Sequence, residues 1–173
     1  VISNPRDNMM VFVFIKRPNS GSADIRLCFN DDTSGNSTYS YRTKIKNTRS
    51  KDTTSVESNS TGIQINANAK NECFTVMRIR NIAGKEKYVH GTTSGGTASG
   101  ASEENAVNEF WGKWVGDGGS LTQITKVNVV TTAGSSSSYF QSGSEVVVLG
   151  MDDGETDEGT NAMQELVKVT VDS

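Results

Sequence analysis

The stretch Ile25-Arg26-Leu27-Cys28-Phe29-Asn30-Asp31-Asp32-Thr33-Ser34-Gly35-Asn36-Ser37-Thr38-Tyr39 is the most informative part of the sequence. Large apolar side chains occupy every second position of its first five residues, which predicts a strand with one buried face. Asn and Asp side chains bond their own backbone and Gly accepts positive φ, so the middle of the stretch predicts a turn. The stretch therefore indicates a strand, a turn and the start of a second strand.

Similar short apolar segments recur along the chain between stretches rich in Gly, Ser and Asn. Such spacing is typical of strands joined by polar loops. Strands are expected at Met9–Lys16, Asp24–Phe29, Tyr39–Ile45, Gly62–Asn66, Cys73–Arg80, Glu86–His90, Phe110–Val115, Ile124–Thr131, Glu145–Met151 and Glu165–Val171. One short helix is expected at Ser102–Phe110, capped by Ser102. A flexible loop is expected over Gly91–Gly100.

These segments predict an all-β protein, a jelly-roll-type β-sandwich of about eight to ten short strands with at most one short helix. The 173 residues are expected to form a single domain, 1–173, in which 152–173 adds an acidic loop and an extra C-terminal strand. That strand either pairs with a neighbouring subunit or completes its own sheet. The apolar spacing of Ile124, Val127 and Val129 changes from three to two, which predicts a bulge near Thr125 and Lys126.

Composition disfavours several kinds of partner. The net charge of −3 and the pI near 5.2 argue against nucleic acid and anionic membranes, which attract an excess of Lys and Arg. The longest apolar run, Met9–Ile15, is too short to span a bilayer. Alternation places Cys28 opposite the core face of its strand and Cys73 on the core face of another. We therefore expect two free thiols, which suit a reducing cytoplasm.

Residues that carry chemistry are few. His90 is the single histidine and precedes the expected loop, so we interpret it as a surface or interface residue. One His and two separated Cys do not supply a zinc site. The acidic stretch 152–158 lacks the spacing of an EF-hand and is interpreted as a solvated hairpin. Asp31 and Asp32 are interpreted as turn residues. No catalytic residue, cofactor or metal is predicted, and the protein is expected not to be an enzyme.

Aromatic residues offer another kind of site. Trp111 and Trp114 are three positions apart and are expected on opposite faces of a strand, one in the core and one at an edge or interface. Trp111, with Tyr88 and His90, forms a candidate surface for binding. Tyr39 and Tyr41 share one face of their strand.

Three stretches together resemble a family of β-sandwich virion proteins of tailed bacteriophages, described as minor structural or head-decoration proteins. The turn quoted above is similar to the family's "apolar-x-Phe-Asn-x-Asp-Thr-Gly-x-Asn-Tyr" element, with Ser34 and Ser37-Thr38 as small insertions. Gly112-Lys113-Trp114 followed by Ile124-Thr125-Lys126-Val127 resembles an aromatic residue before an "Ile-Thr-x-Ile" strand. The stretch from Tyr139 to Met151 resembles "Phe-x-x-Gly-Ser", a strand and "Leu-x-Gly-Ile", although Val148 replaces the usual Tyr.

The resemblance implies a structural virion protein, and a capsid decoration or cement subunit is the leading form. It implies binding to the major capsid protein or other virion subunits, self-association as a trimer, assembly in the host cytoplasm and a place on the capsid surface. The residues that carry it are expected to be scaffold residues: Asn30, Asp32, Gly35, Asn36, Tyr39, Trp114, Ile124, Phe140, Gly143, Ser144 and Gly150.

Two alternatives remain. The chain can be a tail or fibre adhesin domain that binds a host glycan or receptor through Trp111, Trp114, Tyr88 and the Gly91–Gly100 loop. A less favoured alternative is an enzyme that acts on a polysaccharide with Asp31, Asp32 or Glu145.

Overall fold

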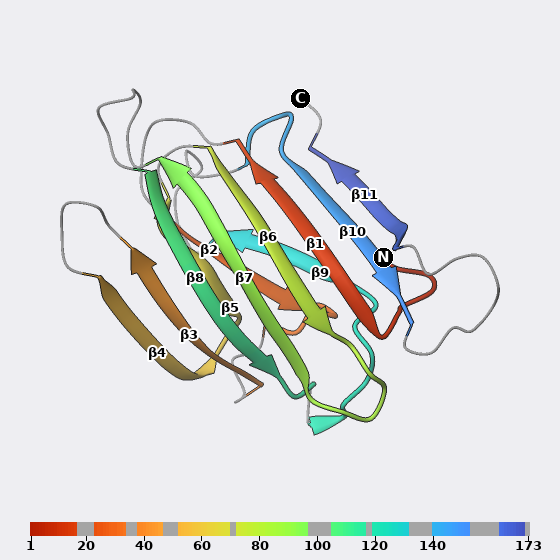
Figure 1. Ribbon diagram of the computed structural model, residues 1–173. Coiled ribbons are helices and arrows are strands. Elements are labelled where there is room, and N and C mark those ends of the chain that lie inside the picture. Colours follow the sequence, from red (N-terminus) through yellow and green to blue (C-terminus); the bar gives the residue numbers. More distant parts are fainter. Residues whose placement is uncertain are drawn as a thin grey trace.

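The protein is a sandwich of two antiparallel sheets, with three strands packed behind eight (Figure 1). The computed structural model describes residues 1–16, 23–33, 38–46, 52–69, 72–96, 105–116, 119–131, 140–152 and 163–171. Its strands are β1 (Asn8–Ile15), β2 (Ala23–Phe29), β3 (Tyr39–Lys46), β4 (Thr53–Ser60), β5 (Ile63–Ala69), β6 (Cys73–Arg80), β7 (Lys87–Gly96), β8 (Asn105–Trp114), β9 (Val127–Thr131), β10 (Glu145–Met151) and β11 (Gln164–Thr170).

The large sheet has the order β11-β10-β1-β6-β7-β8-β3-β4, and the small sheet has the order β5-β2-β9. The chain changes sheets between β4 and β5, where only Thr61 and Gly62 separate the two strands. β5 packs across β3, β7 and β8. The small sheet therefore covers one face of the large sheet, called here the inner face, and the opposite face is called the outer face.

Strict alternation of side chains builds the core between the sheets. In β1, Met9, Val11, Val13 and Ile15 are buried while the residues between them are partly or fully exposed. Successive side chains of a strand point to opposite faces, so one apolar residue in every two suffices to cover the inner face. The small sheet contributes fully buried side chains to the same core: Ile25, Leu27 and Phe29 from β2, and Ile63 and Ile65 from β5.

The turn after β2 connects the small sheet to the segment before β9. Asn30 and Asp31 both adopt positive φ, at 51° and 61°. The Asn30 side-chain oxygen accepts backbone N–H groups of Thr125 (2.8 Å) and Lys126 (3.0 Å), and its amide donates to the Gln123 carbonyl at 3.0 Å. Asn tolerates the left-handed conformation better than most residues, so one side chain satisfies both the turn and its neighbour.

An aromatic cluster joins β2 to the large sheet. The rings of Phe29, Tyr39 and Trp114 lie 5.6 to 6.4 Å apart. The Trp114 indole donates to the buried Asp32 carboxylate at 2.8 Å. The Tyr39 hydroxyl accepts the Phe29 N–H at 2.7 Å and donates to the Asp32 carbonyl at 3.0 Å. These bonds satisfy buried polar groups of Phe29, Asp32 and Trp114.

The structure confirms the all-β prediction and the β-sandwich. It also confirms that β2 buries Ile25, Leu27 and Phe29 and that Trp111 and Trp114 lie on opposite faces. Cys28 and Cys73 are both free, as expected. Both are buried, although Cys28 was expected on the face of its strand opposite the core. The extra C-terminal strand, β11, completes its own sheet by pairing with β10.

The predicted helix at Ser102–Phe110 is wrong where the structure describes it, because Asn105–Trp114 is the strand β8. Its Asn108, Phe110, Gly112 and Trp114 are buried at a spacing of two. β8 lies between β7 and β3 and forms ladders with both. A helix of one or two turns is marginal by itself and cannot match two complete ladders.

The expected flexible loop at Gly91–Gly100 is also wrong over Gly91–Gly96, which continues β7. A Cβ on Gly91 would lie 2.5 Å from the Phe110 ring and 2.6 Å from the Met77 Cβ. Gly91 is therefore needed for close packing rather than for flexibility. Residues 97–100 lie outside the described part of the chain.

Two further expectations differ from the structure. β4 was not expected, because it is an edge strand of Thr, Ser and Asn that is exposed along nearly its whole length and lacks apolar alternation. The bulge near Thr125 and Lys126 is absent, since the strand begins at Val127. Ile124 is fully buried in the irregular segment before it, where the Asn81 side chain accepts its N–H at 2.6 Å.

We expect Asn30→Ala to lower the free energy of unfolding by about 2 kcal/mol more than Asn59→Ala, measured by urea denaturation. Asn59 also has positive φ, at 60°, but it is exposed, and no hydrogen bond of its side chain is found among the described residues. Asn59→Ala therefore carries the same backbone strain without the lost bonds to residues 123–126. Equal losses in the two variants would contradict this assignment.

The fold should lose stability in alkaline solution. Burial raises the pKa of the Cys28 thiol to about 11 and also raises the pKa values of the Tyr39 and Tyr41 hydroxyls. The unfolded chain releases these protons at lower pH, so the free energy of unfolding falls as pH rises above about 9. Burial lowers the pKa of Lys87, which acts with the opposite sign and offsets part of the loss.

The expected loss is about 1 kcal/mol between about pH 8 and about pH 10, measured by urea denaturation. Cys28→Ala removes one of the titrating groups and should make the decline shallower. A free energy of unfolding that stays level or rises over this interval would contradict the interpretation.

Candidate binding surface

None of the described strands packs against the outer face of the large sheet, because the small sheet covers the opposite face (Figure 1). Cross-strand pairing aligns its side chains in rows that run perpendicular to the strands. One row contains Leu149, Met10, Arg78, His90, Trp111 and Arg42 in that order. The next row toward the end of β1 contains Val147, Phe12, Val76, Thr92, Glu109 and Lys44. The apolar and the charged residues therefore lie in different parts of the face.

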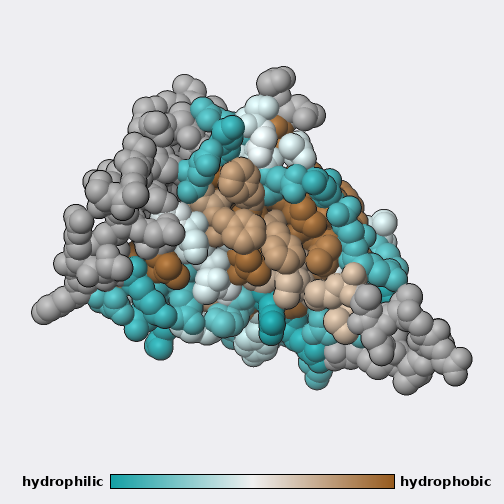
Figure 2. Space-filling model, turned by 45° about the horizontal axis from the view of Figure 1, so that its top comes forward, coloured by the Kyte–Doolittle hydropathy of each residue, from teal (hydrophilic) through white to brown (hydrophobic). Residues whose placement is uncertain are grey.

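An apolar patch occupies β10, β1 and β6. It consists of Met10, Phe12, Phe14, Phe74, Val76, Val147 and Leu149. Phe74 is 45% exposed and Phe14 38% exposed, and the rings of Phe12 and Phe74 stack at 6.4 Å. Figure 2 shows the patch as a brown area bordered by hydrophilic side chains. An exposed apolar area of this kind is typical of a surface that meets another protein.

An aromatic and cationic row lies on β6, β7, β8 and β3, and comprises Arg78, His90, Trp111 and Arg42. The rings of His90 and Trp111 stack almost in parallel, 5.3 Å apart with an interplanar angle of 10°. Trp111 is 39% exposed. Because register places Arg78 beside His90 and Arg42 beside Trp111, a guanidinium borders the stacked pair on each side.

Hollows lie on both sides of the Trp111 ring. One has a volume near 590 Å³ and is lined by residues that include Met10, Arg78, Tyr88 and His90. The other, near 450 Å³, is lined by Arg42, Lys44, Thr54 and Trp111. Trp111 thus borders a larger hollow with both methionine and arginine side chains and a smaller one with Arg42 and Lys44.

The cations of this region differ in whether they have acidic partners. Each lysine on the outer face of β8 and β3 lies within 3.5 Å of a carboxylate: Lys44 near Asp52, Lys46 near Glu109 and Lys113 near Glu86. Within the described ranges, neither Arg42 nor Arg78 forms an ion pair. The Glu86 carboxylate also accepts the Tyr88 hydroxyl at 2.8 Å, which holds the pKa of that carboxyl below its usual value.

The structure brings Tyr88, His90 and Trp111 to one face, as the candidate surface requires. Trp114, expected to contribute to the adhesin platform, is instead 1% exposed on the inner face. The strand Lys87–Gly96 replaces most of the loop that was expected beside the platform. Arg42 and Arg78 were not singled out from the sequence, although Arg42-Thr43-Lys44 and Arg78-Ile79-Arg80 show the alternation that places cations on one face of a strand.

Most of the expected scaffold residues lie away from the outer face. Asn30, Asp32, Tyr39, Trp114 and Ile124 form the contacts between β2, β3, β8 and the segment before β9 that are described above. Gly35 and Asn36 lie outside the described residues.

Phe140, Gly143 and Ser144 precede β10, and Gly150 lies within it. The Gly143 N–H donates to the Val171 carbonyl at 2.8 Å, and the Ser144 hydroxyl accepts the Lys16 N–H at 3.0 Å. Phe140 is half-buried and packs against the core. A Cβ on Gly150 would lie 2.5 Å from Leu166, so a glycine is needed there for β11 to approach.

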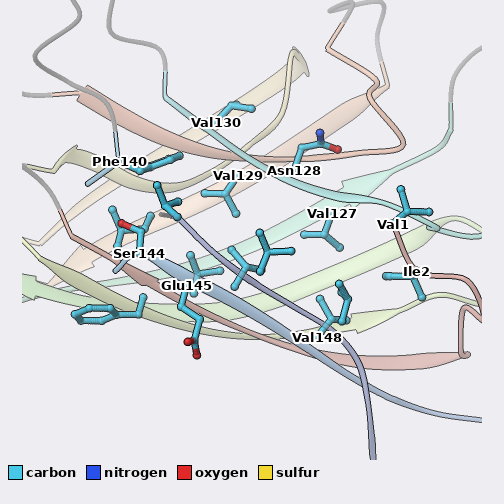
Figure 3. A pocket seen from close by; sticks show the side chains of 17 residues that line it. Val1, Ile2, Val127, Asn128, Val129, Val130, Phe140, Ser144, Glu145 and Val148 are labelled. Carbon is cyan, nitrogen blue, oxygen red and sulfur yellow. The ribbon is translucent and has the colours of Figure 1, made fainter. Parts of the chain in front are cut away.

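A cavity distinct from the two surface hollows lies between the sheets, where β9 faces β10 and β11 (Figure 3). Its volume is near 300 Å³, and its walls consist mainly of valines, with Ile2 and Phe140. Glu145 borders it but extends its carboxylate outward, to within 2.8 Å of Lys168. The cavity therefore presents an apolar lining. Residues 132–139, which precede Phe140, lie outside the described chain.

The carboxylates considered for polysaccharide chemistry have different surroundings. Asp31 lies at the surface 2.7 Å from Lys126, Asp32 accepts the Trp114 indole, and Glu145 pairs with Lys168. Among the described residues no group of three or more His, Cys, Asp and Glu is placed to hold a metal ion. Among the described residues, no helix is long and apolar enough to cross a membrane.

Comparisons of the chain with protein-family models, with curated proteins and with solved structures found no match. The fold and the two regions of the outer face are therefore what the chain itself offers for assigning a function.

Proposed function

We propose that the protein is a non-enzymatic structural subunit of a tailed-phage particle, and that it acts as a decoration or cement protein on the head. In this proposal the apolar patch of Met10, Phe12, Phe14, Phe74, Val76, Val147 and Leu149 binds the major capsid protein or another virion subunit. The single observation that carries the proposal is this patch, which lies on three adjacent strands and contains three phenyl rings, those of Phe14 and Phe74 more than a third exposed.

Covering the patch with a partner is favourable in free energy. Removal of apolar surface from water contributes about 25 cal/mol for each Å², and aromatic side chains dominate the binding energy of many interfaces. The patch stands on a ladder of paired strands whose backbone is already ordered, so little backbone freedom is lost when a partner covers it. A lattice that presents many copies of one partner gains stability in proportion to the subunits bound, by mass action.

The class of assembly comes from the resemblance of three stretches to β-sandwich virion proteins. Trimer formation belongs to the same proposal, because a head decoration subunit meets the lattice at its symmetry axes. Neither the trimer nor the place on the head depends on the aromatic and cationic row.

We expect the purified protein to bind undecorated heads of a tailed phage saturably, at a fixed ratio to the capsid subunits, in a sedimentation assay. Phe74→Lys places a charge on the most exposed phenyl position of the patch and should weaken binding at least about tenfold. Light scattering of the free protein should give the mass of three chains.

Val56→Lys is the matched control. Val56 is 63% exposed on the edge strand β4, at the end of the outer face farthest from the patch, and should leave binding unchanged. Circular dichroism of both variants checks that the sandwich is retained. The proposal fails if heads bind no protein saturably, or if the two lysine variants bind alike.

A further inference from the structure

We propose that the row Arg78, His90, Trp111 and Arg42 is a binding site for a carboxylated saccharide, such as a uronic acid within a surface polysaccharide. This site lies beside the apolar patch and does not depend on the proposed place in a phage particle. It assigns a ligand class to the aromatic residues and adds two arginines as the groups that recognise the charge.

The surface around the row carries more basic than acidic side chains. Outward side chains of β6, β7, β8 and β3 include the cations Arg42, Lys44, Lys46, Arg78, Arg80 and Lys113 and the acid Glu109, which lies 3.5 Å from both Lys46 and His90. Asp52 and Glu86, outside these strands, lie beside Lys44 and Lys113, so the cations still outnumber the acids around the row. The whole chain nevertheless carries a net charge of −3. Basic side chains are therefore concentrated on this part of the surface, which favours an anionic partner.

The two arginines of the row differ from the neighbouring lysines in their ion pairs. As shown above, the lysines on this face have carboxylate partners, whereas Arg42 and Arg78 form no ion pair within the described ranges. A guanidinium presents a planar fork of donors that matches a carboxylate in two parallel hydrogen bonds. Each arginine is thus available to bind a carboxylate without first breaking an internal ion pair.

The aromatic pair has a shape that suits a sugar ring. His90 stacks against one face of Trp111, and the hollow with Arg42, Lys44 and Thr54 adjoins the tryptophan on the β3 side. A broad ring surface accepts the apolar C–H face of a sugar, while charged groups at its border recognise polar substituents. The stacked imidazole covers one face of the indole and leaves the side toward β3 for a ligand.

The same features fit a nucleic acid less well. Single-stranded nucleic acids are held by several ring faces that stack on successive bases. Here the two aromatic rings of the row stack on each other, and 5.3 Å between their centroids leaves no room for a base. Arg78 and Arg42 are also separated by three strand intervals, about 14 Å, which is wide for the dense charge of a phosphate backbone.

The test uses a trimer of galacturonic acid, its methyl ester and a single-stranded DNA oligomer as ligands. The chain has two tryptophans, and the buried Trp114 serves as an internal reference for a fluorescence change at Trp111. The acid trimer should bind and alter the emission. The ester, which keeps the ring and loses the charge, should bind at least about tenfold more weakly.

Arg42→Gln and Arg78→Gln should each weaken binding of the acid trimer about tenfold, measured by calorimetry. Lys168→Gln removes the same charge from the outer face at β11, away from the row, and should change the affinity less than about twofold. Trp111→Phe should abolish the fluorescence change. All of these side chains except the half-buried indole are exposed, so the fold should persist.

Four results would overturn the proposal: no binding of the acid trimer at millimolar concentration, equal binding of the acid and its ester, tighter binding of DNA than of the acid, or equal affinities for the arginine variants and Lys168→Gln. Any of them leaves the head-binding assay unaffected, because Phe74 and the row are tested separately.

Discussion

The hydrogen bond from the Trp114 indole to the buried Asp32 carboxylate is the contact on which the position of β8 depends. A carboxylate buried at the junction of the two sheets is costly unless it is hydrogen-bonded, and the indole N–H of Trp114 donates to it. The Phe29 and Tyr39 rings pack against that indole. Because Trp114 is held inward, the alternation of the strand turns Trp111 outward, three residues away. The same contact that closes the core therefore also presents the aromatic row.

The unequal size of the sheets explains why the protein has a broad outer face. The three-stranded sheet packs on one face of the eight-stranded sheet and forms the core there. The other face of the eight-stranded sheet therefore remains available for partners. Register then divides that face, with Phe12, Phe14 and Phe74 on β1 and β6, and the row from Arg78 on β6 to Arg42 on β3 beside them. An apolar half and a basic half on one rigid ladder favour two different kinds of partner, which is why the two proposals concern separate residues.

The sequence predicts those elements whose burial is recorded in local alternation, such as β1, β2 and β6. It fails where the decisive neighbour is distant. β4 consists of Thr, Ser and Asn and is ordered by its ladder with β3. Residues 105–110 are held by β7 and β3, and Gly91 and Gly112 are glycines because Phe110 and Ile63 occupy the space of their side chains. Glycine in a strand resembles glycine in a loop until its neighbours are known.

The candidate surface shows the same division. By itself, the sequence determined an all-β chain, opposite faces for Trp111 and Trp114, an inward face for β2 and the turn residues Asn30 to Asp32, because each follows from backbone geometry within a few residues. Only the tertiary structure decided that Arg78, His90, Trp111 and Arg42 form one row, since these residues come from four strands. Strand order and register are set by long-range pairing, which no local pattern specifies.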